Sequence, residues 1–155
     1  MFAALRFRRK WPILITVLAL ALLTSLEARA EGYRYIVQVD KYEFELKLNS
    51  EYSAQYFADA LPIDLEMKRW GDQFYGASPV IFDSYIESTS SMQVGHLAYW
   101  PPGQTLCLFF GSTPTSPGLS PQLGSPGLVL GSLIGDVTLL RSLGPQTSLT
   151  IYVVE

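Results

Sequence analysis

The sequence predicts a mainly β protein, a closed barrel of about eight strands with one clear helix and one short helix. Three observations support this class. Seven or eight short segments rich in β-branched and aromatic residues are separated by glycine, proline and other turn residues. One segment alone has a convincing helical period. The chain has 155 residues and no internal repeat, which leaves room for one such domain.

Residues 1–30 have the three parts of a secretory signal peptide. A basic region comes first, an apolar core follows over Ile13–Leu23, and Ala28-Arg29-Ala30 is a small-x-small cleavage site. The apolar core is shorter than the roughly 20 residues of a membrane span. We expect cleavage after Ala30, export to the periplasm or the cell exterior, and a barrel domain over residues 31–155. The alternative is an uncleaved segment, which would be the protein's one membrane contact.

The charge of the remaining domain argues against nucleic acid as a partner. Residues 1–30 hold five of the eleven basic residues and one of the fourteen acidic ones. The other 125 residues therefore carry six basic and thirteen acidic residues, a net charge of about −7. A surface with that balance repels a phosphate backbone.

The barrel is predicted to begin with a hairpin and a helix. Tyr33–Asp40 is rich in β-branched and aromatic residues, and Tyr42–Leu48 alternates apolar with charged residues, as a half-buried strand does. Glu51–Ala60 places Tyr52, Tyr56 and Ala60 on one stripe, with Phe57 beside it, and ends before Pro62. We expect this helix to plug one end of the barrel.

A strand over Ile63–Trp70 follows, since its apolar and charged residues alternate. The chain from Gly71 to Gly76 is predicted to be irregular. Pro79–Tyr85 is expected to form a short strand or a loose helix. Ile86–Gln93, rich in serine, threonine and glutamate, is expected to form an exposed loop.

The stretch Gly95–Gly111 predicts the central hairpin. His96–Trp100 is a short aromatic strand, Pro101-Pro102-Gly103 forces a turn, and Leu106–Phe110 is an apolar strand.

The last part of the chain alternates loop, strand and short helix. Ser112–Pro126 holds four prolines and is predicted to be a long surface loop. Gly127–Ile134 is predicted to be a strand with a bulge or a close backbone approach at Gly131. Asp136 is expected to cap a short helix over Val137–Leu143, and Thr147–Val154 is the final strand.

Four of these stretches resemble motifs of the small bacterial cyclophilin-like proteins. They are Leu61–Met67, Gly95–Gly103, Leu106–Gly111 and Ser125–Gly131, in family order, within a match over residues 33 to 155. The resemblance implies an eight-stranded cyclophilin-like β-barrel capped by helices. The strings Phe-His-Arg and Phe-Met-x-Gln-Gly-Gly of true cyclophilin prolyl isomerases are absent. His96 also stands where the family usually has an acid. The resemblance therefore implies the fold more than the isomerase activity.

Aromatic residues carry the main hypothesis about function. Tyr99-Trp100 and Phe109-Phe110 are pairs of adjacent aromatic residues on the predicted strands. Neighbours on a strand point to opposite faces, so one residue of each pair faces the core and the other faces a cleft or the solvent. An outward aromatic cluster would bind a proline-rich peptide or a small apolar ligand. The candidate ligand-binding residues are Met67, Tyr99, Trp100, Phe109 and Phe110.

The function predicted first is an exported binding module, and the alternative is a divergent peptidyl-prolyl isomerase. Isomerisation needs an apolar pocket and a hydrogen-bond donor, usually an arginine, because its barrier comes from amide resonance. The candidates for this donor are Arg69, beside Trp70, and Arg34, and Arg69 is the candidate catalytic residue. A purely structural partner domain is a third possibility.

We expect neither a cofactor nor a metal site. His96 and Cys107 are the only histidine and cysteine, whereas a zinc site needs three or four ligands. No G-x-S-x-G elbow indicates a hydrolytic triad. His96 is expected at the surface or in a turn, and Cys107 in the core as a small hydrophobic residue.

Overall fold

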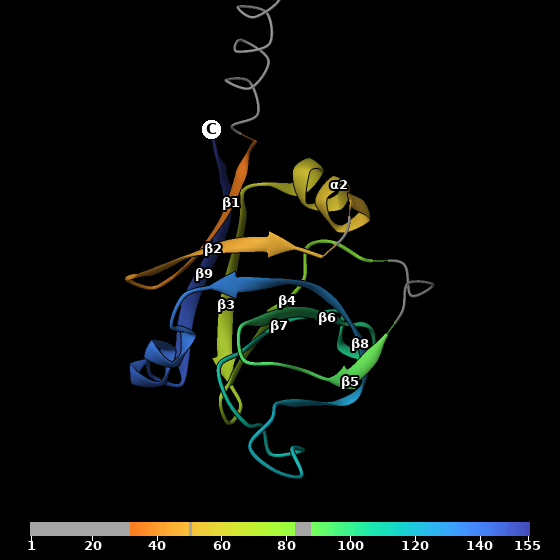
Figure 1. Ribbon diagram of the computed structural model, residues 1–155, viewed down its shortest axis with the longest axis vertical. Helices are drawn as coiled ribbons and strands as arrows, with labels where there is room; N and C mark the ends of the chain where they lie inside the picture. The colour runs from red at the N-terminus through yellow and green to blue at the C-terminus, as the bar shows by residue number, and fades with distance from the viewer. Residues whose placement is uncertain (1–31, 50, 83–87) are drawn as a thin grey trace, which may run out of the picture. The chain divides into compact units, whose positions relative to one another are not determined.

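Eight antiparallel strands form a closed ring (Figure 1). The computed structural model describes residues 32–49, 51–82 and 88–155, and the barrel unit spans Arg34–Val154. Going round the ring, the strands run in the order β2-β1-β9-β3-β4-β7-β6-β8, and pairing of β8 with β2 closes it. The strands are β1 (Arg34–Val39), β2 (Tyr42–Leu48), β3 (Ile63–Arg69), β4 (Gln73–Ala77), β6 (His96–Trp100), β7 (Thr105–Phe109), β8 (Gln122–Ile134) and β9 (Gln146–Val154).

A ninth strand, β5 (Thr89–Ser91), pairs with the first part of β8 and is not part of the ring. The predicted class, a mainly β barrel of about eight strands, is therefore confirmed. Two predictions fall on residues that are not described: the signal peptide over residues 1–30, and the part of the Pro79–Tyr85 and Ile86–Gln93 segments between residues 83 and 87.

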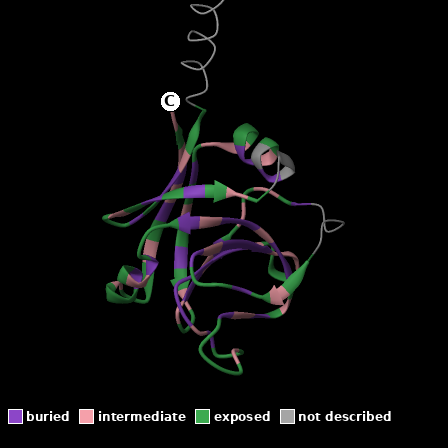
Figure 2. Ribbon diagram, viewed as in Figure 1, coloured by how far each residue is buried: buried purple, intermediate pink, exposed green. Residues whose placement is uncertain are grey.

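Buried apolar side chains fill the inside of the ring, and Figure 2 marks the buried residues along its strands. They come from alternate positions of each strand, as the pleat requires. In β2, for example, Phe44 and Leu46 are buried while Glu43, Glu45 and Lys47 are exposed. The predicted faces of this strand are thus confirmed. The fully buried members of this core include Val37, Phe57, Phe74, Leu97, Leu106, Leu108, Phe110, Leu130, Leu149 and Ile151.

Helix α2 (Glu51–Ala60) adds its apolar face to this core, as predicted. Phe57 is fully buried, and its ring centroid lies 5.8 Å from that of Phe82. The Phe82 ring lies 5.1 Å from the ring of Tyr99 on β6. An aromatic chain therefore joins the helix to the barrel interior.

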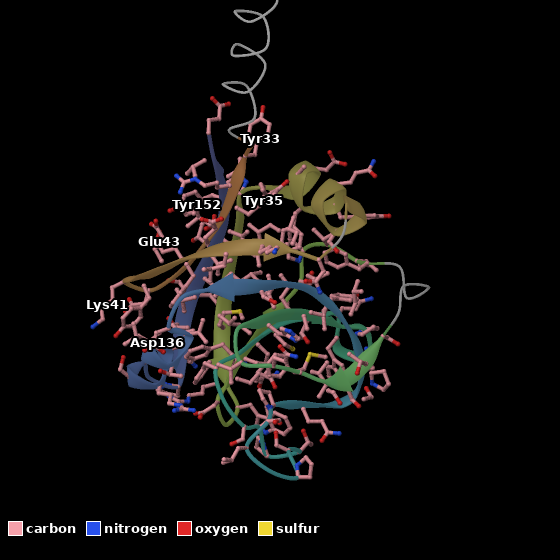
Figure 3. The ribbon with its side chains drawn as sticks, in the orientation of Figure 1. Tyr33, Tyr35, Lys41, Glu43, Asp136 and Tyr152 are labelled. Atoms are coloured by element: carbon pink, nitrogen blue, oxygen red, sulfur yellow. The ribbon has the colours of Figure 1, made fainter. Side chains whose placement is uncertain are left out.

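The short helix after β8 is a 3-10 helix, η2 (Val137–Ser142), and its predicted cap is present. Asp136 Oδ1 accepts a hydrogen bond from the backbone N–H of Thr138 at 3.1 Å (Figure 3). On another part of the surface, the Tyr152 hydroxyl of β9 donates to Glu43 Oε2 of β2 at 2.9 Å, across β1. Both contacts are exposed: the first caps η2, and the second links β9 to β2.

Predictions for three segments are wrong in part. The segment after Gly71 contains β4, which the sequence hides because both of its faces are largely buried and no alternation shows. The predicted Ile86–Gln93 loop contains β5, and Met92 after it is buried. The described part of Pro79–Tyr85, residues 79–82, forms neither strand nor helix.

The predicted Ser112–Pro126 loop ends earlier than expected, because β8 begins at Gln122 and includes Pro126. Proline is tolerated there because β8 changes its hydrogen-bonded neighbour near this point, from β5 to β6. The pairing of β6 with β8 also shifts register between Leu97 and Ala98, opposite Gly131 and Val129. A Cβ on Gly131 would lie 2.5 Å from the backbone oxygen of Lys47, so the close approach predicted at this glycine is confirmed.

Among the described residues, no helix has the length and apolar character needed to cross a bilayer.

Candidate functional site

A pocket of about 280 Å³ lies on the outer surface of the ring, over strands β4, β7 and β6. Three aromatic side chains form much of its wall, and one buried amide belongs to its lining. The described residues that line it are Trp70, Gln73, Tyr75, Trp100, Thr105, Cys107, Leu123 and Gly124. None of these side chains is charged. The pocket therefore offers an apolar surface with a few neutral polar groups.

Strand alternation explains why these side chains meet outside the ring. Phe74 of β4 belongs to the barrel core, so Gln73 and Tyr75 on either side of it face outward. The same rule places Cys107 outward between two core leucines of β7. Tyr75 lies directly opposite Cys107 in the pairing of β4 with β7. Three neighbouring strands thus present one continuous outward face.

A second, smaller apolar cluster supports this face from outside the barrel. Its buried members are Met92, Ala98, Cys107, Phe109 and Leu123, and Tyr75, Trp100 and Val129 pack against it. Leu123 comes from the first part of β8 and Met92 follows β5, so these two segments form a cover over the sheet. The pocket is the part of the face that this cover leaves open.

Trp100 ends β6 and is held by a hydrogen bond. Its indole Nε1 donates to Ser125 Oγ at 2.8 Å. The bond fixes the ring against β8 and uses the only polar group of the side chain. Trp100 therefore presents a ring surface to the pocket. Trp70, in the turn between β3 and β4, is 40% exposed and forms another part of the wall.

Gln73 is the unusual residue of the pocket. Its side chain is 4% exposed, and Oε1 has no hydrogen-bond partner among the described residues. A buried amide oxygen without a partner costs about 1–3 kcal/mol relative to a paired one. Gln73 is also one of the residues that line the pocket.

Cys107 is buried, as predicted, and it also belongs to the pocket lining. Burial raises the pKa of its thiol from 9.0 to about 11, and hydrogen bonds with Thr105 and Gln73 act in the opposite direction. The Thr105 hydroxyl lies 3.7 Å from Sγ. At neutral pH the residue is a neutral thiol, so it contributes an apolar contact and not a nucleophile.

The long loop before β8 is anchored at its base. Thr113 is 5% exposed, and its hydroxyl donates to the backbone oxygen of Gln122 at 2.6 Å. Its backbone N–H donates to Ser116 Oγ at 2.9 Å. The backbone N–H of Met92 donates to Pro121 O at 3.1 Å. These bonds fix the start of β8, from which Leu123 and Gly124 reach the pocket.

The structure brings one of the five sequence-predicted ligand residues, Trp100, into the pocket. Met67, Tyr99 and Phe110 point into the barrel core. Phe109 faces outward but is fully buried in the outer cluster and does not line the pocket. Of each aromatic pair, one member therefore faces the core and the other faces outward.

Arg69, the candidate catalytic residue, belongs to a separate network. Its guanidinium donates to the backbone oxygens of Gly71, Arg141 and Leu143 at 2.9, 3.0 and 2.9 Å and to Asp72 Oδ1 at 2.9 Å. It also lies 5.1 Å from the ring centroid of Phe110. These contacts join the β3–β4 turn to helix η2. Arg69 does not line the pocket.

Sequence reasoning missed most of the pocket. Gln73 and Tyr75 were assigned to an irregular segment, although their spacing around Phe74 would place them on one face of a strand. The signal that could have revealed β4 is Gly71-Asp72, a turn directly after the clear strand β3. Leu123 and Gly124 were hidden in the predicted loop.

His96 and the acidic residues provide no metal centre in the part of the chain that the structure describes, where no three His, Cys, Asp or Glu side chains cluster suitably. His96 is half-buried at the start of β6, and its Nδ1 accepts a hydrogen bond from the backbone N–H of Gln93 at 3.2 Å. Burial lowers the pKa of the imidazole.

Comparison with known proteins supports the fold and the family. The model of the Cyclophilin-like family matches residues 34–152. A hypothetical protein from Archaeoglobus fulgidus, whose structure was solved in solution, has a TM-score of 0.64 and 28% sequence identity, covering 79% of this chain and 98% of that protein. No curated protein matches the sequence. With most of its length matched by the family model, the chain belongs to the Cyclophilin-like family.

Proposed function

We propose that this protein is an exported binding module whose outer pocket takes a small, mainly apolar ligand or a side chain of a peptide. The observation that carries the proposal is a pocket wall with three aromatic residues, Trp70, Tyr75 and Trp100, on the outside of a barrel whose interior is filled. Exposed aromatic surface in a concave site is typical of ligand binding.

The chemistry of the pocket favours binding over catalysis. Its wall has no charged side chain among the described residues, and Cys107 is a neutral thiol. A prolyl isomerase would need the guanidinium of Arg69 as its hydrogen-bond donor. That guanidinium already makes four hydrogen bonds at the β3–β4 turn. These features support a site that recognises neutral groups.

Export is proposed from the sequence of residues 1–30, with its basic start, apolar core and Ala28-Arg29-Ala30 site. Mass spectrometry of the protein recovered from the periplasm or the medium should give Glu31 as the first residue. Recovery of the intact chain from the cytoplasm alone would overturn the export proposal.

Binding can be tested by adding toluene and indole to the ¹⁵N-labelled protein and following the indole N–H signals by NMR. We expect the Trp100 signal to shift with saturation, and the Trp100→Ala variant to bind at least tenfold more weakly. Tyr152→Ala, which removes an aromatic ring from β9 outside the pocket, is the control and should bind normally. Absence of any saturable shift with either probe would overturn the proposal. Catalysis of proline isomerisation by the wild type, lost in Trp100→Ala, would replace it with the isomerase alternative.

A further inference from the structure

We infer that the pocket selects an uncharged aromatic ring that carries one N–H or O–H donor, and that Gln73 Oε1 accepts the hydrogen bond from this donor. The inference rests on the proposed binding function and names the class of ligand for the same site. It depends on the amide of Gln73, on the state of the other polar groups in the wall, and on the size of the pocket.

The amide oxygen of Gln73 requires a partner that the protein does not supply. Gln73 is only 4% exposed. Its Oε1 is shielded from water and has no hydrogen bond among the described residues. Polar atoms in that state are rare in folded proteins because their desolvation is not compensated. In most cores such a residue would be replaced by an apolar one of similar shape. Gln73 lines the pocket, so a turn of its side-chain amide towards a bound ligand would bring Oε1 within reach of a donor.

The ligand must supply a donor and not an acceptor, because Oε1 only accepts. Two other polar groups of the wall already have partners, and the Tyr75 hydroxyl can both donate and accept, so it does not change this requirement. Trp100 Nε1 donates to Ser125, and the Thr105 hydroxyl pairs with Cys107 Sγ. No charged side chain lines the pocket to pair with an ionic ligand, and an unpaired ion in an apolar site is strongly disfavoured. The ligand is therefore neutral.

The shape of the site favours a ring. Trp70, Tyr75 and Trp100 provide aromatic surfaces that stack well on a flat group. The volume of about 280 Å³ lies just below the range for ligand pockets, roughly 300–1,000 Å³. This size suits one ring or a fused pair, such as a phenol or an indole. The same chemistry occurs in free small molecules and at the ends of tyrosine and tryptophan side chains in peptides.

The inference is tested by pairs of probes that differ only in the donor. NMR titration should show p-cresol binding about fivefold more tightly than toluene, and indole more tightly than benzofuran, since one net hydrogen bond has that effect on affinity. In Gln73→Met, which keeps the length of the side chain but removes the acceptor, toluene should bind at least as tightly as p-cresol. Gln38→Met makes the same change on an exposed strand position and should keep the wild-type preference.

The outcomes separate the inference from the function that it rests on. Equal binding of both members of each pair to the wild type, or an unchanged preference in Gln73→Met, would overturn the inference while leaving the binding function intact. No saturable binding of any of the four probes would overturn both. The indole and benzofuran pair decides the question even if Gln73→Met does not fold. Capped tyrosine amide that binds as tightly as p-cresol would identify peptide side chains as the source, and much weaker binding would identify free small molecules.

Discussion

Nη2 of Arg69 donates to Oδ1 of Asp72 at 2.9 Å, and this ion pair closes the turn between β3 and β4. The second oxygen of Asp72 accepts from Nε of Arg141 at 3.0 Å, so one carboxylate joins the turn to helix η2. The turn carries Trp70, and β4 starts immediately after it with Gln73. The network therefore supports one side of the pocket without entering it.

Replacing Arg69 by lysine should lower the free energy of unfolding by about 1–3 kcal/mol, because an ammonium group cannot reproduce the four directed hydrogen bonds of the guanidinium. Urea denaturation measures the change. Arg34→Lys, at an exposed position on β1, is the matched control and should alter stability by less than about 0.5 kcal/mol. Equal effects of the two substitutions would show that the network contributes nothing.

Gly76→Ala should destabilise the fold by about 1–3 kcal/mol through overpacking. A Cβ at this position would lie 2.6 Å from Met67 Sδ and 2.7 Å from the backbone oxygen of Glu66, where β4 crosses close to β3. Thermal unfolding followed by circular dichroism measures the effect. Gly144→Ala, where no atom lies within 4 Å of the added Cβ, is the control. A Gly76→Ala protein as stable as the control would contradict the close approach of the two strands.

Cys107 should make stability fall between about pH 9 and pH 11. Burial raises the pKa of the folded thiol from 9.0 to about 11, so in this window the folded state keeps a proton that the unfolded state has lost. The unfolded state binds fewer protons, and stability therefore decreases as pH rises. Two pKa units correspond to about 2–3 kcal/mol, fully lost only above the folded pKa. Below pH 9 the group has no such effect.

Denaturant unfolding of the wild type and Cys107→Ala at a series of pH values isolates this contribution, because other titrating groups are common to both proteins. The difference in stability between the two should be constant up to about pH 9 and shrink or reverse above it. A difference that does not change with pH up to 11 would mean that the thiol is as accessible in the folded state as in the unfolded one.

Ser125→Ala should free the Trp100 ring and lower stability by about 0.5–1.5 kcal/mol, the net value of a typical hydrogen bond. The indole N–H signal of Trp100 should move and its exchange with water should accelerate. Ser120→Ala, in the exposed loop, is the control. An unchanged indole signal in Ser125→Ala would show that the bond does not hold the ring.

Where apolar and charged residues alternate, as in β2 and β3, the sequence predicted the strands and the faces they bury. The ends of α2 and the cap of η2 were also predictable, because Pro62 and Asp136 are local signals. The central hairpin was predictable from its turn. These features depend on neighbouring residues, so a pattern along the chain reveals them.

The pocket was mostly not predictable, because it depends on which strands become neighbours and on what covers them. In Gln73–Ala77 both faces are largely buried, so the alternation that marks β3 is missing. The choice between Tyr99 and Trp100 depends on strand register, which pairing with β7 and β8 decides. Phe109 could not be assigned either, since Met92 and Leu123, distant in sequence, cover it.

Strand β8 serves two tasks along one continuous backbone. Its last residues, 131–134, pair with β2 and close the ring, whereas its first residues, near Leu123 and Gly124, form part of the pocket wall. The two tasks are separated by Pro126 and the change of pairing partner. A substitution or insertion before Pro126 would therefore alter the pocket wall without touching the pairing that closes the ring.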